Sequence, residues 1–157
     1  IWQKFTNPVQ AEFSRFKLVK ENGQSTKAKL DDNHTFLLTW QGNRIKNVKG
    51  QHLHKYDYDI AYNASGKIDK MNGPNGEEIT FTYDGNQLKM ITAMTMYKGK
   101  PSPIAVGELL ENNAMGFKMR SKMYTRGKPM KDKHIRGIFN CSCEKIGDRQ
   151  YKSVTVY

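Results

Sequence analysis

The sequence predicts an all-β protein, an antiparallel meander of repeated hairpins that forms a curved sheet or a partly closed barrel. The first observation is alternation, since large side chains occupy every second position at Tyr56, Tyr58, Ile60 and Tyr62. This period of two is typical of a strand with two different faces. The second is the regular recurrence of turns rich in glycine and asparagine. A helix is disfavoured, because apolar residues at three-four spacing never extend over ten positions without a glycine.

The central segment, residues 55–91, is expected to fold as strand, turn, strand, turn. Its turns combine residues that favour tight chain reversal, at 63–66, 72–76 and 84–86. Alternating residues return after each turn, and they predict strands at 56–62, 67–71, 79–83 and from 88 onward.

The remaining elements follow the same pattern. Residues 1–10 are expected to be a lead-in, and residues 12–20 a first strand with Phe16 and Leu18 inward. Further strands are predicted at 35–40, 44–49, 88–97, 117–124, 135–143 and 151–157. Residues 104–115 are compatible with one helical turn or with a strand, and the sequence leaves both open.

The strand-and-turn unit is repeated. Residues 40–45 (WQGNRI) match residues 83–88 (YDGNQL) as aromatic, polar, Gly, Asn, polar, aliphatic, and residues 62–68 (YNASGKI) match with one insertion. The leading aromatics lie 22 and then 21 residues apart. A period of this length predicts hairpin units that bury their apolar faces on their neighbours.

This unit resembles the YD repeats of RHS-type proteins over residues 36–91. The residues that carry the resemblance are Tyr62, Gly66, Lys67, Ile68, Pro74, Asn75, Gly76, Tyr83, Asp84 and Leu88. The chain departs from the family pattern where Lys67 or Gln87 replaces the usual Arg, and where Asn63 follows Tyr62. In that family the repeats are β-hairpins in a curved sheet, and a chain of this length is too short for a toxin shell.

The resemblance implies a small secreted or lipid-anchored bacterial protein, of a type found in Bacteroidetes with no assigned activity. A sequence that begins at Ile1 would fit removal of a leader or lipoprotein signal. We therefore expect a secreted or outer-envelope localisation, with membrane attachment only through such a removed N-terminal anchor.

Length and composition bound the architecture. The 157 residues predict one domain, 1–157, with C-terminal strands over 117–157 and no apolar run that could span a bilayer. The 26 basic and 15 acidic residues give a net charge of +11, which favours anionic partners.

Basic residues concentrate between residues 117 and 136, where Asp132 is the single acid. If Phe117, Met119 and Met123 face inward, the residues between them form an outward ladder. The predicted binding residues are Lys118, Arg120, Lys122, Tyr124 and Arg126. Such a ladder could track phosphates or acidic sugars, with Tyr124 available for stacking. The alternative is a solvated strand face whose lysines prevent edge pairing.

Other groups are weaker candidates. His52 and His54 have a spacing compatible with zinc, but no third ligand is defined. Asp57 with Asp59, and the neighbouring acids at 77–78, could serve a glycoside hydrolase. Ordinary loop histidines and an alternating strand face explain these residues equally well.

The tyrosine stripe at positions 56, 58, 62 and 83 could stack on sugars or could pack the core. Cys141 and Cys143 point to the same face of a strand, and we expect free thiols rather than a strained disulfide. The sequence indicates no cofactor and no metal.

We therefore expect a non-catalytic cell-envelope or secreted structural or binding module rather than an enzyme. The alternative is binding of a polyanion, such as an anionic glycan or another cell-surface polymer, through residues 117–136. Nucleic acid is not expected, since no nucleic-acid-binding motif is present. The oligomeric state stays open.

Overall fold

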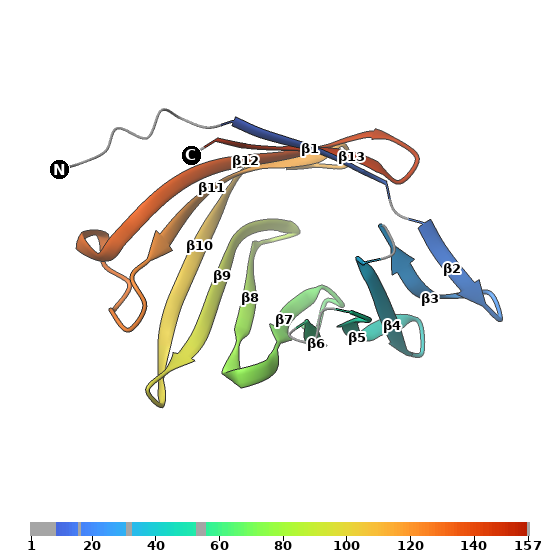
Figure 1. The fold of residues 1–157 in the computed structure, drawn as a ribbon, viewed down its shortest axis with the longest axis horizontal. Helices are drawn as coiled ribbons and strands as arrows, with labels where there is room; N and C mark the ends of the chain where they lie inside the picture. The colour runs from blue at the N-terminus through green and yellow to red at the C-terminus, as the bar shows by residue number, and fades with distance from the viewer. Residues whose placement is uncertain (1–8, 16, 31–32, 53–55, 157) are drawn as a thin grey trace.

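A computed structural model describes residues 9–15, 17–30, 33–52 and 56–156. These residues form one antiparallel sheet of thirteen strands, in which neighbours in the sequence are neighbours in the sheet, apart from β1. The sheet curls strongly but does not close (Figure 1). The predicted all-β meander and its curvature are confirmed, and the sheet is an open one rather than a complete barrel.

The strands vary in length from five to fourteen residues. They are β1 (Val9–Arg15), β2 (Lys17–Glu21), β3 (Gln24–Lys29), β4 (Thr35–Gln41), β5 (Arg44–Gly50), β6 (Asp57–Tyr62), β7 (Ile68–Asn72), β8 (Glu78–Asp84), β9 (Gln87–Tyr97), β10 (Lys100–Asn113), β11 (Gly116–Tyr124), β12 (Ile135–Gly147) and β13 (Gln150–Val156). Two short 3₁₀ turns, η1 (Pro74–Gly76) and η2 (Asp132–His134), lie between strands.

The two edges of the sheet are formed by strands that are consecutive in the chain. β1 pairs with β13, whereas β2 pairs with β3. The single strand predicted over 12–20 is therefore wrong, because its two halves belong to opposite edges. Two peptide units join Arg15 to Lys17, so these edges meet within about 7 Å at one corner.

Two other expectations concern element boundaries. Of the expected lead-in, Val9 and Gln10 belong to β1, and residues 1–8 lie outside the described residues, as does Phe16. The segment 104–115, left open between helix and strand, lies mostly in β10, which pairs with β9 and β11. Pairing on both sides satisfies its backbone groups, which one isolated helical turn could not do.

A recurrent irregularity explains the curvature. The pairing register shifts by one residue immediately before Trp40, Tyr62 and Tyr83, at the same place in three successive hairpins. An extra residue on one strand is a β-bulge, which bends that strand and increases its twist. Bulges repeated at one end of the sheet therefore curl it in a constant direction.

The two faces of the sheet differ in chemistry. Paired residues share a face, so the register defines an apolar row through Ile60, Met71, Ile79, Ala93, Ala105 and Met123. The opposite face carries Lys49, Asp57, Asp59, Lys70, Glu78, Glu108, Arg120 and Asn140. We call these the inner and the outer face.

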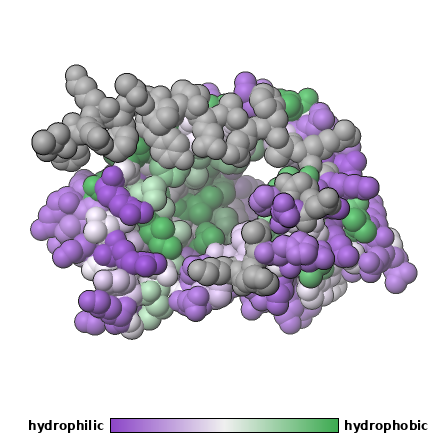
Figure 2. Space-filling view, in the orientation of Figure 1, coloured by the Kyte–Doolittle hydropathy of each residue, from purple (hydrophilic) through white to green (hydrophobic). Residues whose placement is uncertain are grey.

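The inner face has no second layer packed on it within the described chain. The buried hydrophobic residues there are Leu109 and Tyr124, which are 8% and 7% exposed, and most large side chains are half-buried. Figure 2 shows hydrophobic residues gathered in a hollow of the molecule. The fold thus creates an apolar trough rather than a filled core.

Candidate functional site

Three successive hairpins are joined by the same hydrogen bond. Tyr62 donates from its hydroxyl to the Ile45 carbonyl at 2.6 Å, and Tyr83 donates to the Ile68 carbonyl at 2.8 Å. The indole nitrogen of Trp40 donates to the Ser25 carbonyl at 2.6 Å. The segments that align in the sequence therefore occupy equivalent positions in the sheet.

The residue just after each turn completes the junction. Gln24 donates to the Gly42 carbonyl and Lys67 to the Gly85 carbonyl, both at 3.3 Å. The guanidinium of Arg44 reaches the next turn in the same way, because a Cβ built on Gly66 would lie 2.7 Å from Arg44 Nη2.

Two of these residues are cations placed over tyrosine rings. The Arg44 guanidinium lies 5.3 Å from the centre of the Tyr62 ring, and the Lys67 ammonium lies 5.1 Å from that of Tyr83. Distances of this size permit a cation–π attraction. Arg44 and Lys67 thus belong to the inner-face junctions and were not among the predicted site residues.

The tyrosine stripe has an internal structural role. Tyr58 donates to Glu77 Oε2 at 2.7 Å, and Tyr56 makes edge-on ring contacts with Tyr58 and Phe36. Burial, followed by the bond to Glu77, raises the pKa of Tyr58 to about 12. Because Tyr58, Tyr62 and Tyr83 already use their hydroxyls, the stripe keeps few groups with which to hold a sugar.

The predicted basic ladder is present on β11. Lys118, Arg120 and Lys122 alternate with Met119 and therefore share the outer face, as expected. Each faces an acid: Lys118 pairs with Glu111 at 2.9 Å, Lys122 pairs with Asp132 at 3.4 Å, and Arg120 lies opposite Glu108 in the register. The ladder is consequently close to neutral.

The other two predicted ladder residues lie elsewhere. The Tyr124 ring is buried, so it offers no free face for stacking, contrary to the expected outward orientation. Arg126 follows the end of β11, and its guanidinium lies 5.9 Å from the centre of the Tyr97 ring. The loop turns back here: the buried Ser102 hydroxyl accepts a hydrogen bond from the Gly127 nitrogen at 2.7 Å.

A depression of about 540 Å³ borders the ladder. Its lining includes the cations Lys89, Arg120 and Lys122, the acid Glu108, and the apolar side chain of Val106. It is the one place in the described chain where ladder cations and a concave surface coincide in a cavity of this size.

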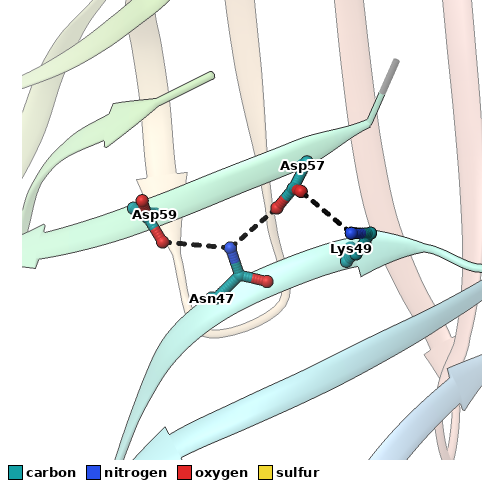
Figure 3. A network of polar contacts seen from close by, with 4 residues as sticks. All are labelled: Asn47, Lys49, Asp57 and Asp59. Atoms are coloured by element: carbon teal, nitrogen blue, oxygen red, sulfur yellow. Dashed lines mark hydrogen bonds and ion pairs between the residues drawn. The ribbon is translucent and has the colours of Figure 1, made fainter. Parts of the chain in front are cut away.

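Asp57 and Asp59 belong to a polar network on the outer face (Figure 3). The Asn47 amide donates to both carboxylates, at 2.9 and 3.0 Å, and Lys49 lies 3.2 Å from Asp57. The bond from Asn47, then that from Lys49, lowers the pKa of Asp57. A general acid needs a raised pKa, so this arrangement provides strand pairing rather than acid–base chemistry.

The expected histidine and cysteine chemistry lacks a centre. His52 lies in the bend after β5, and His54 lies outside the described residues. No group of three His, Cys, Asp or Glu side chains that could hold a metal occurs in the described part of the chain. Cys141 and Cys143 are free thiols on the inner face, as predicted, and burial raises the pKa of Cys141.

The fold defines the class of protein, an all-β chain with one open, curled sheet and an apolar inner face. Comparison with known protein families, with curated proteins and with solved structures finds no match. In the described residues, no helix has the length and apolar character needed to cross a membrane.

Proposed function

We propose that the protein is a non-catalytic binding module whose binding surface is the apolar inner face. The observation that carries this proposal is the apolar trough itself, visible as a hollow in Figure 2. Large contiguous apolar surfaces on a folded protein mark binding sites, because water contact with them is unfavourable. Covering such a surface gains roughly 25 cal/mol for each Å² removed from water.

The chemistry of the face supports an apolar ligand. Along the row that contains Met71, Ile79 and Met123 the side chains carry no hydrogen-bonding group. The tyrosine hydroxyls nearby are engaged by Glu77 and by main-chain carbonyls. A sugar bound here would lose hydrogen bonds to water without replacement, whereas an apolar molecule would not.

The compartment is part of the same proposal. The resemblance to YD-repeat proteins favours a secreted or envelope-anchored module, and the repeated junctions at Trp40, Tyr62 and Tyr83 fit a protein built from serial hairpins.

Binding of the neutral fluorescent dye Nile red tests the binding surface. We expect its emission to increase with the folded protein and to fall with the Met71→Gln variant, which makes the inner face more polar. Met90 lies on the outer face opposite Thr82, so Met90→Gln is the matched control. Equal dye binding by the two variants, with both folded by circular dichroism, would contradict the proposal.

The second candidate function is polyanion binding through the outer face of β11. It is favoured by the depression that Lys89, Arg120 and Lys122 line. Replacing Lys118, Arg120 and Lys122 with Glu should then abolish retention on immobilised heparin while the fold is kept. Unchanged retention would eliminate this function.

A further inference from the structure

We propose that the ligand of the inner face is an amphiphile with a single acyl chain and an anionic head group, such as a long-chain fatty acid. This inference rests on the proposed function and specifies its ligand class. The apolar trough receives the chain, and cations at one end of the trough, Arg44 and Lys67, bind the head group.

Arg44 and Lys67 lie at the same end of the sheet. In an antiparallel meander alternate connections fall at one end. Arg44 directly follows the turn between β4 and β5, and Lys67 follows the turn between β6 and β7. Both cations lie beside inner-face tyrosine rings, so they flank the apolar row at its end.

The charge of these two cations is available to a ligand. Lys67 donates to the neutral partners Asn86 and Gly85, and Arg44 contacts the Tyr62 ring. In residues 17–30, 33–52 and 56–156, neither forms an ion pair with a carboxylate. The outer-face cations Lys49, Lys70 and Lys118 differ, since each has a carboxylate partner.

Unpaired cations beside an apolar surface select for a ligand that has both features. The apolar chain leaves water for the trough, and the carboxylate forms charge-assisted hydrogen bonds with the guanidinium and ammonium groups. A neutral amphiphile gains the first contribution only. A cationic amphiphile gains the first and is repelled by the second.

The test is displacement of Nile red by three molecules with the same twelve-carbon chain, used below the concentration at which micelles form. We expect dodecanoate to bind about tenfold more tightly than dodecanol, a difference of about 1.4 kcal/mol. Dodecyltrimethylammonium should bind most weakly. Added salt should reduce the advantage of dodecanoate, because screening weakens exposed charge pairs.

Charge-neutralising variants locate the head group. The double variant Arg44→Gln, Lys67→Gln should lose the preference for dodecanoate and still bind Nile red. Lys70→Gln, which removes an outer-face cation, is the control and should keep the preference.

The outcomes separate this inference from the proposed function. If Nile red binds but the three amphiphiles compete equally, the ligand class is wrong and the apolar site stands. If Nile red does not bind, both are wrong. If sedimentation shows a dimer that Met71→Gln dissociates, a second copy covers the face and the inference is overturned.

Discussion

Tyr62 donates a hydrogen bond to the main-chain carbonyl of Ile45, 2.6 Å away, and so joins one hairpin to the next. The contact is repeated by Tyr83 and the Ile68 carbonyl. In a sheet without a second layer, such side-chain contacts between neighbouring hairpins replace part of the packing that a filled core would provide.

Removal of one junction hydroxyl should destabilise the sheet. Tyr62→Phe leaves the Ile45 carbonyl without this donor, and we expect a loss of about 1 kcal/mol in the free energy of unfolding. Tyr83→Phe should cost a similar amount, because its junction is equivalent. Urea unfolding measures both, and an unchanged midpoint for either variant would show that its junction contributes nothing.

Alkaline pH should weaken the fold through Tyr58. Its pKa rises from 10.0 to about 12 on folding, so the folded chain holds this proton more tightly than the unfolded chain. The stabilisation is complete below pH 10 and is lost as the pH rises toward 12. Urea midpoints measured across this range should fall less steeply for Tyr58→Phe than for the parent chain.

Tyr56 and Tyr83 also have raised pKa values, so Tyr58→Phe should retain part of the pH dependence. Identical slopes for variant and parent would mean that Tyr58 titrates normally. Ultraviolet titration of the phenolate signal provides an independent check on the same assignment.

Acid pH should act through Asp57 in the opposite direction. Asn47 and Lys49 lower its pKa from 3.8, so the stability that it contributes is present above this value and is lost as the pH falls further. In Asn47→Ala the pKa of Asp57 should return toward 3.8, as measured by NMR titration of its carboxyl carbon. A pKa that stays low would show that Lys49, and not Asn47, is the main cause.

The loop after β11 should depend on Ser102. The hydroxyl is almost fully buried and accepts from the Gly127 nitrogen at 2.7 Å, so Ser102→Ala leaves that donor unpaired. We expect a loss of about 1–3 kcal/mol. Ser65→Ala, in an exposed turn, is the control and should change little. Equal stability of the two variants would refute the anchoring role of Ser102.

Much of the fold follows from the sequence, because alternation and turn residues act locally. The hairpin at Thr35–Gln41 and Arg44–Gly50 lies within a residue of its prediction at each boundary. The repeat that begins at Trp40, Tyr62 and Tyr83 also predicts equivalent contacts. The separation of β1 from β2 was missed, since no local signal shows that adjacent residues pair with strands from opposite ends of the chain.

The candidate site was harder to predict. Alternation placed Lys118, Arg120 and Lys122 on one face, but the acids that balance them come from β10 and from the following loop. The alternation also marked the inner face as apolar. Whether another layer covers such a face depends on the whole topology, and in this chain the meander supplies only one sheet.

The central claim, an accessible apolar inner face, is tested most directly by photocrosslinking a diazirine analogue of a fatty acid and mapping the labelled peptides by mass spectrometry. The account predicts labels on inner-face residues of β6 to β9, such as Ile60, Ile79 and Ile91. Labels confined to outer-face residues such as Met90 and Ile138 would contradict it.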